Sequence, residues 1–261
     1  MTTVVSVHSF RGGTGKSNTT ANVAANLAAA GSRVAVIDTD VQSPGIHTLF
    51  GYDQDFEHTL DDYLWGKTDI SGAVHDVSDR IEGLPDGPGQ LFLVPASMQA
   101  SDIARILRDG YDVVRLNEGF RDLARTLDLD YLFIDTHPGL NEETMLSITV
   151  SDVLLLLLRP DNQDYQGTAV TVDIARRLSV PNLQLVVNKV PDVVDLDDLR
   201  SQLDEAYAAP TAAVLPLSTD MVINASGGLF SLTNPDHAWS QGIRDIVEVL
   251  QRETAPDTPT A

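Results

Sequence analysis

Short apolar runs recur along the chain, and longer segments with apolar residues at helical spacing separate them. The run that ends at Leu158 is apolar on both faces that a strand presents, which is typical of a strand buried on both sides. The pattern predicts strands at 4–7, 33–37, 91–95, 131–134, 152–158, 183–187 and 213–215.

The intervening segments predict helices. Residues 18–30 are rich in Ala, Asn and Leu, and Gly31 follows them in the position of a C-terminal cap. Near the end of the chain, Ile243, Ile246 and Leu250 form an apolar stripe whose spacing suits packing on a core. Helices are expected at 18–30, 46–50, 59–65, 98–109, 112–127, 165–178, 196–207 and 243–251.

The alternation of strands and helices predicts the fold class. It indicates an α/β protein with a doubly wound, mostly parallel sheet, right-handed crossovers and helices on both faces. A chain of 261 residues is long enough for one such domain, which we expect to span residues 1–252. The stretch 82–89 is expected to be an exposed loop, and 253–261 a disordered C-terminal tail.

Composition narrows the chemistry. The chain has no cysteine, which excludes disulfides, cysteine-ligated metals and iron–sulfur clusters. It contains 17 basic and 38 acidic residues, for a net charge of −21. Such a surface repels nucleic acids and anionic membranes at long range. The acidic excess fits either adaptation to high salt or a genome that replaces Lys with Arg.

Two further features of the pattern concern location and partners. The sequence contains no run of 18 apolar residues, so we expect no membrane span. No signal-peptide layout is visible, and we therefore expect a cytoplasmic protein. The helices expected at 98–127 carry a row of arginines, and one interpretation of this row is a stripe that faces DNA. The acidic residues of the same segment balance them one for one, which favours solvated faces with local ion pairs.

The strongest chemical signal is the segment 10–17, Phe-Arg-Gly-Gly-Thr-Gly-Lys-Ser, between the first expected strand and the first expected helix. This context is the one that a phosphate-binding loop requires. Glycines let backbone N–H groups approach phosphate oxygens, and the helix N-terminus adds its positive end. Lys16 would reach the β- and γ-phosphates, and the Ser17 hydroxyl would bind Mg²⁺. The alternative is a glycine-rich turn that merely joins the two elements.

Three other strands end in polar residues at the same expected edge of the sheet. Asp135 follows four apolar residues, the layout of a Walker B aspartate that holds Mg²⁺. Asp38 and Asp40 follow the second strand, where ligands bind in doubly wound sheets, although Asp is also a common turn former. Asn188 follows a later strand, and its amide offers the donor and the acceptor that an adenine edge needs. A plain strand-end turn is the alternative for Asn188.

The run 11–17 resembles the deviant phosphate-binding loop of the ParA/MinD family of positioning ATPases, Lys-Gly-Gly-x-Gly-Lys-Ser/Thr. Residues 38–40 resemble the family's first switch, Asp-x-Asp, and residues 135–139 its second switch, Asp-x-x-Pro-Gly. Two positions depart from these patterns. Phe10 stands where a general P-loop has glycine, and Arg11 stands where the family has its leading lysine.

The resemblance, which extends over residues 4–252, implies a P-loop NTPase that forms a homodimer with ATP sandwiched between its subunits. In the family, the lysine at the position of Arg11 reaches the partner's phosphates. Asp40 would position or deprotonate the attacking water, Asp38 would help to organise the metal site, and Asn188 would read the adenine. The nucleotide-binding candidates are Arg11, Gly12, Gly13, Thr14, Gly15, Lys16, Ser17, Asn18 and Asn188; the catalytic candidates are Arg11, Lys16 and Asp40; and the metal candidates are Ser17, Asp38 and Asp135.

The function implied is that of an ATP- and Mg²⁺-dependent ATPase that positions a plasmid, chromosome locus, division site or protein assembly under the control of an activator or adaptor protein. The related iron–sulfur carriers and the nitrogenase iron protein are excluded by the missing cysteines. A ligase of the dethiobiotin or cobyrinate amidation kind and a non-hydrolysing scaffold are the alternatives. DNA is a possible partner that the net charge disfavours, and membrane attachment is not expected, because the helix at 243–251 lacks a basic face. His137 has no companion ligands, so we assign it no metal; a lone His is more often structural than catalytic.

Overall fold

One eight-stranded sheet forms the centre of the computed structural model, which describes residues 1–52, 56–81 and 88–254. The order across the sheet is β3-β4-β2-β5-β1-β6-β7-β8, and the pairing of β3 with β4 alone is antiparallel among the described strands. The strands are β1 (Thr3–His8), β2 (Arg33–Asp38), β3 (His75–Asp76), β4 (Gln90–Val94), β5 (Tyr131–Asp135), β6 (Val153–Leu158), β7 (Asn182–Val190) and β8 (Thr211–Pro216).

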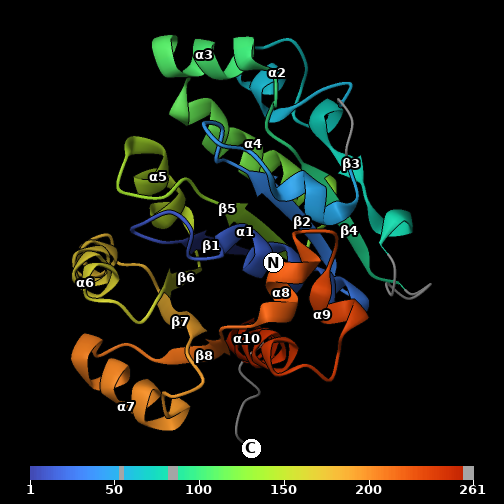
Figure 1. Cartoon of the computed structure of the whole chain (residues 1–261). Coiled ribbons are helices and arrows are strands. Elements are labelled where there is room, and N and C mark those ends of the chain that lie inside the picture. Colours follow the sequence, from blue (N-terminus) through green and yellow to red (C-terminus); the bar gives the residue numbers. More distant parts are fainter. Residues whose placement is uncertain (53–55, 82–87, 255–261) are drawn as a thin grey trace, which may run out of the picture.

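Helices cover both faces of the sheet (Figure 1). They are α1 (Lys16–Ala29), α2 (Leu60–Leu64), α3 (Ala100–Asp109), α4 (Val113–Thr126), α5 (Glu142–Val150), α6 (Asn162–Arg177), α7 (Leu196–Tyr207), α8 (Thr219–Asn224), α9 (Phe230–Thr233) and α10 (Ala238–Thr254), with short 3₁₀ helices at Ile46–Phe50, Ser71–Ala73 and Ser78–Arg80. The predicted fold class is confirmed.

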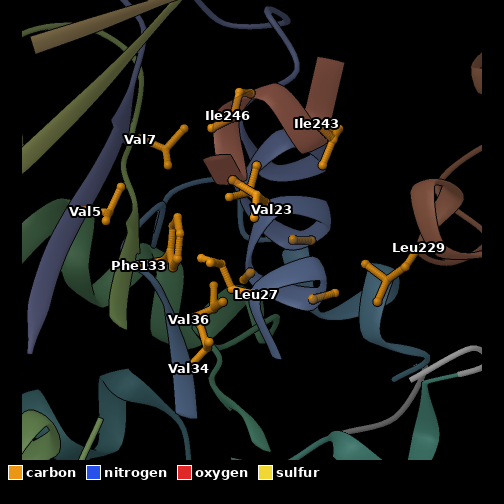
Figure 2. Close-up of a cluster of buried hydrophobic side chains, with 14 of the residues drawn as sticks. Val5, Val7, Val23, Leu27, Val34, Val36, Phe133, Leu229, Ile243 and Ile246 are labelled. Atoms are coloured by element: carbon orange, nitrogen blue, oxygen red, sulfur yellow. The ribbon is translucent and has the colours of Figure 1, made fainter. Parts of the chain in front are cut away.

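The larger part of the core lies between the sheet and the layer formed by α1, α9 and α10. Figure 2 shows Val5 and Phe133 of the sheet facing Val23 and Leu27 of α1, with Ile243 of α10 on the far side of that helix. On the opposite face, α2, α3 and α4 pack on β2, β4 and β5, while α6 and α7 pack on β6, β7 and β8. Alternate residues of β6 belong to opposite faces, as the continuous apolar run predicted.

Strand register places the chemistry at one edge of the sheet. The central strand β1 pairs with β5 and β6, so the loop that follows it leaves from the middle of the sheet. In the parallel pairing of β2 with β5, Asp38 is the direct partner of Asp135. Val7 of β1 pairs with the same Asp135. The carboxyl ends of β1, β2 and β5 therefore meet side by side, where ligands bind in sheets of this type.

Some element predictions were incomplete. The helices α5, α8 and α9 and the short strand β3 were not predicted, although Asn141 caps α5 by accepting a hydrogen bond from the Thr144 N–H at 2.8 Å. The terminal helix begins at Ala238 and reaches Thr254, so the tail predicted from residue 253 begins too early. Residues 255–261, and residues 82–87 of the predicted loop, lie outside the described residues.

The apolar stripe of α10 is buried, as its spacing predicted. Ile243, Ile246 and Leu250 are each 0 % exposed and pack against α1 and β8. Because this stripe is buried, the end of the chain packs on α1, the helix that follows the glycine-rich loop. Across the described ranges, no helix combines the length and the apolar character that a membrane span needs.

Several arginines of α3 and α4 contact side chains close to them in the fold. Arg108 pairs with Asp109, and Arg125 pairs with Asp122, as the balanced charges predicted. Arg105 instead lies over the Trp65 ring, with 4.1 Å between the guanidinium carbon and the ring centroid. Such contacts place the positive charges of this surface beside aromatic or acidic neighbours.

The packing of α10 on α1 predicts that alanine substitutions at two isoleucines differ strongly in their effect on protein stability. Ile243→Ala should lower the free energy of unfolding by about 2–5 kcal/mol, because it leaves a cavity in a fully buried position. Ile223→Ala is the matched control, since Ile223 is 74 % exposed and should change stability by less than about 0.5 kcal/mol. Urea unfolding followed by circular dichroism measures both, and equal effects would contradict this account of the core.

Candidate functional site

The glycine-rich loop joins the end of β1 to Lys16, the first residue of α1. Gly13 and Gly15 adopt φ angles of 77° and 98°, a region that favours glycine. Gly15 is the N-cap of α1, and no side chain caps the first turn of this helix. The N–H groups of that turn therefore keep their hydrogen-bonding capacity for an anion.

Strand β7 holds the loop from one side. The Asn188 side-chain amide donates to the Thr14 carbonyl at 2.8 Å, and the Lys189 ammonium donates to the Gly13 carbonyl at 2.8 Å. The Asn188 side-chain oxygen accepts from the Lys189 N–H at 2.8 Å. These contacts engage two successive loop carbonyls from outside and so fix the curvature of the loop.

Lys189 is a site residue that the sequence interpretation missed. Its φ of 61° is unusual for a residue with a side chain, and such strain often marks functional positions. A signal was available, since the chain has three lysines and two of them, Lys16 and Lys189, lie at the loop. Asn188 keeps its predicted place beside the loop, but its amide supports the loop backbone in addition to facing the site.

Two buried carboxylates lie side by side at the ends of β2 and β5, and the Lys16 charge acts on one of them, Asp135. Asp38 and Asp135 are each 1 % exposed, and Lys16 is 7 % exposed. Burial raises the pKa of Asp135 to about 6, against the opposing effects of the Lys16 charge and a hydrogen bond from Ser17. Burial, followed by the charge of Asp135, raises the pKa of Asp38 well above its usual value. Ionising both carboxylates is therefore costly, which favours a cation beside them.

The donor set fits Mg²⁺. A divalent cation beside Asp38 and Asp135 would favour their ionised forms and relieve the repulsion between them. Within the described residues, no group of three or more His, Asp or Glu side chains is placed to hold a metal alone. Mg²⁺ suits such a site, because it is commonly held by one or two protein groups together with phosphate oxygens and water. Ser17 lies next to Asp135 and completes the predicted metal set.

Asp40 lies just beyond the carboxylate pair. Its N–H donates to Asp38 Oδ1 at 3.0 Å, so the two predicted residues of the first switch contact each other. Asp40 Oδ1 accepts from the Ser43 N–H at 3.2 Å, from the Ser43 hydroxyl at 3.0 Å and from His137 Nδ1 at 2.6 Å. His137 therefore belongs to the site, although the sequence favoured a structural role for it.

The second switch is attached to β1. The Thr136 N–H and hydroxyl both donate to the Val7 carbonyl, at 3.3 and 2.9 Å, and the Gly139 N–H donates to the Ser9 carbonyl at 3.1 Å. His8 Nδ1 contacts the Thr136 hydroxyl at 2.8 Å. Burial, with a smaller effect of the Lys16 charge, lowers the pKa of His8 to about 3, so this imidazole is neutral.

The two positions that depart from the loop patterns have different surroundings. Phe10 packs on α6, because a Cβ placed on Gly167 would lie 2.1 Å from the Phe10 ring. Arg11 is exposed, and its guanidinium makes no hydrogen bond or ion pair with the described residues. Its charge contributes to the lowered pKa of Asp164 after the larger effects of Arg159. Among the described residues, the Arg11 guanidinium is thus exposed and without a polar partner.

A cavity of ≈ 170 Å³ opens directly beside the loop. Its lining joins the loop to β7, β8 and α8, and its apolar wall with a few amides suits the base and ribose of a nucleotide. The lining includes Gly15, Asn18, Asn188, Lys189, Pro216 and Leu217. A larger hollow of ≈ 550 Å³ lies at the starts of β7 and β8, at the other end of the sheet from the loop.

The structure brings the predicted residues together at the carboxyl edge of the sheet. Lys16, Ser17, Asp38, Asp40 and Asp135 converge in front of the loop. Asn18 and Asn188 line the adjacent cavity. Gly12, Gly13, Thr14 and Gly15 form the loop backbone, and Arg11 stands at its exposed side. The arrangement can bind a nucleoside triphosphate with Mg²⁺ and place a carboxylate near its terminal phosphate.

Comparisons with known proteins agree with this geometry. A family model described as an AAA domain matches residues 2–185. The septum site-determining protein MinD of Synechocystis is 26 % identical, over 87 % of this chain and 81 % of that protein. An iron–sulfur cluster carrier protein of Deinococcus radiodurans is also 26 % identical, over 95 % of this chain and 68 % of that protein.

Among solved structures, the septum site-determining protein MinD of Pyrococcus horikoshii, complexed with Mg-ADP, has a similar fold. Its TM-score is 0.78 at 20 % identity, and the match covers 98 % of each chain.

The curvature of the glycine-rich loop predicts that adding one methyl group at Gly15 strongly weakens nucleotide binding. Gly15→Ala should weaken ADP binding by at least about 10-fold, since the new Cβ would lie 2.4 Å from Asn188 Nδ2 at a φ of 98°. Gly51→Ala is the matched control, because Gly51 also has a positive φ but meets nothing within 4 Å. Calorimetric titration of ADP measures both variants, and unchanged affinity in Gly15→Ala would contradict the predicted role of the loop.

Proposed function

Because the chain belongs to the AAA domain family and, within it, to the ParA/MinD ATPases, we propose that it hydrolyses ATP as a homodimer and thereby positions a cellular cargo. ATP would be sandwiched between the two subunits, and an activator or adaptor protein would stimulate turnover. The convergence of Lys16, Asp40 and Asp135 in front of one glycine-rich loop is the observation that supports this proposal most directly.

In this proposal, the loop and the residues around it bind the nucleotide. The loop N–H groups and Lys16 would hold the phosphates, while the cavity lined by Asn18 and Asn188 would take the nucleoside. Ser17, Asp38 and Asp135 would hold Mg²⁺, which supplies charge neutralisation of the phosphates when bound. The low exposure of these carboxylates keeps the electrostatic interactions strong.

Hydrolysis would depend on positioning rather than on covalent chemistry. Asp40 would accept a hydrogen bond from the attacking water and aim it at the terminal phosphate. Lys16 would stabilise the charge that develops there, and Arg11 of the opposite subunit would add a second positive group. The planar guanidinium of Arg11 presents several donors in a fork that matches phosphate oxygens, so it can serve where the family has lysine.

The surface on which such a dimer acts is constrained by charge. A net charge of −21 disfavours DNA and anionic membranes as nonspecific surfaces. The apolar stripe of α10 is already buried against the core, so it is not offered to lipid in this structure. A protein partner or protein assembly is therefore the preferred cargo class.

Two other functions can be separated by experiment. A ligase of the dethiobiotin or cobyrinate kind would hydrolyse or transfer phosphate only after a small substrate is added. A non-hydrolysing scaffold would bind ATP tightly without turnover, even with its partner present. The presence of Lys16, Asp40 and Asp135 in one site supports hydrolysis over a scaffold.

Lys16 and Asp40 should have separable effects. Lys16→Ala should abolish ATP binding, because it removes the buried ammonium beside the loop. Asp40→Ala should retain binding, block turnover and trap the ATP-bound dimer. Lys67→Ala is the control, since Lys67 pairs with Asp62 away from the loop. Nucleotide titration and analytical ultracentrifugation report both effects, and a monomeric Asp40→Ala protein in saturating ATP would contradict the sandwich dimer.

Arg11 should act across the dimer interface. Arg11→Ala lacks the trans-acting guanidinium, and Asp40→Ala lacks the water-positioning carboxylate, so each homodimer should be inactive. In a mixed dimer, the intact Arg11 of one subunit would serve the intact Asp40 of the other, and partial ATPase activity should return. Heterodimers purified by two affinity tags provide the measurement. If they form and restore no activity, the trans role of Arg11 is wrong.

A further inference from the structure

The Asp40 carboxylate is held asymmetrically. Its Oδ1 accepts three hydrogen bonds, two from Ser43 and one from His137. Its Oδ2 accepts none from the residues that the structure describes. A carboxylate oxygen with three donors is saturated, whereas the other oxygen keeps its lone pairs for a water molecule. The geometry thus separates a positioning oxygen from an oxygen that is available to solvent.

The three donors differ in what they anchor. Ser43 lies three residues after Asp40 in the same turn, so it moves with the carboxylate that it contacts. His137 comes from a different strand end, two residues after Asp135 of β5. Its Nδ1 lies 2.6 Å from Asp40 Oδ1, a short contact for a nitrogen donor and a carboxylate. Among the described residues, this is the one hydrogen bond that joins the side chain of Asp40 to the segment directly after Asp135.

His137 is itself well supported. The residue before it, Thr136, is attached to β1 through the Val7 carbonyl, and Gly139 is attached through the Ser9 carbonyl. The carbonyl of His137 accepts from the Thr144 hydroxyl of α5 at 3.3 Å. A short segment anchored on both sides keeps its side-chain direction, and a supporting group of this kind is what precise positioning requires.

We infer that His137 is a positioning residue for ATP hydrolysis, which holds Asp40 through Nδ1 so that Oδ2 faces the attacking water. The inference rests on the proposed function, because it assigns Asp40 the role of orienting water. His137 does not touch the reacting atoms in this account. It joins the first switch to the second, so that the water-positioning carboxylate and the metal-binding carboxylate keep one relative geometry.

Substitutions at His137 test the role through the split between binding and turnover. His137→Ala should lower the single-turnover rate of ATP hydrolysis by roughly 10- to 100-fold, because the carboxylate can then rotate away from its productive orientation. ATP affinity should stay within about twofold, since no phosphate contact is lost. His137→Asn should recover the rate to within about threefold of the wild type, because its amide nitrogen takes the place of Nδ1.

Two controls separate positioning from loss of structure. His58→Ala removes another His–Asp pair, in which His58 Nδ1 lies 3.8 Å from Asp62, and it should leave the rate unchanged. In the Asp40→Ala background, which should retain ATP binding, adding His137→Ala should leave ATP affinity within about twofold, because His137 makes no phosphate contact. A loss of ATP affinity on adding His137→Ala would place His137 in nucleotide binding and would overturn the inference.

A second measurement uses the nucleotide-free protein. Nitrogen-15 NMR of labelled histidine should show His137 Nδ1 protonated and hydrogen-bonded, with a resonance that shifts in Asp40→Ala and not in the His58→Ala control. An unshifted His137 resonance in Asp40→Ala, or a His137→Ala rate within about twofold of the wild type, would overturn the positioning role alone. A wild-type protein that does not hydrolyse ATP would instead overturn the proposed ATPase function, and the role of His137 with it.

Discussion

Two buried carboxylates on adjacent strand ends are the constraint on which this site depends. Asp38 and Asp135 are register partners in the parallel pairing of β2 with β5, and both are almost fully buried. Burial raises the pKa of each; the charge of Asp135 adds to the effect at Asp38, and the charge of Asp40 adds to the effect at Asp135, so ionising both is costly without compensating positive charge. Lys16 supplies part of that charge, and a metal ion with its phosphate ligands would supply the rest.

The same edge of the sheet organises three loops around this pair. Strand β7 holds the glycine-rich loop through Asn188 and Lys189, and Val7 of β1 together with Ser9, the second residue after Val7, holds the second switch. The first switch is tied to the second through His137. Each loop is therefore fixed by contacts outside the strand that it follows, and the contacts of both switches share the carboxyl edge of one sheet.

An acidic protein that binds a polyanion must do so by local interactions. The net charge of −21 opposes the approach of ATP only weakly at physiological ionic strength, where the field is screened within about 8 Å. Within the site, the loop N–H groups, the α1 N-terminus and Lys16 act at contact distance and in low dielectric. The surface charge therefore bears on which macromolecules the protein meets, whereas the nucleotide site is governed by the backbone of one loop.

The sequence by itself determined the fold class and most of the site, because its signals are local. Apolar periodicity predicted all the strands from β1 to β8 with the exception of β3. Glycine spacing together with Lys16 and Ser17 identified the loop. The short elements α8 and α9 escaped prediction, since they carry too few residues for a helical period to emerge. The structure alone decided that Lys189 contacts the loop and that His137 contacts Asp40. Those contacts join residues 176 and 97 positions apart, and only strand register brings such residues together.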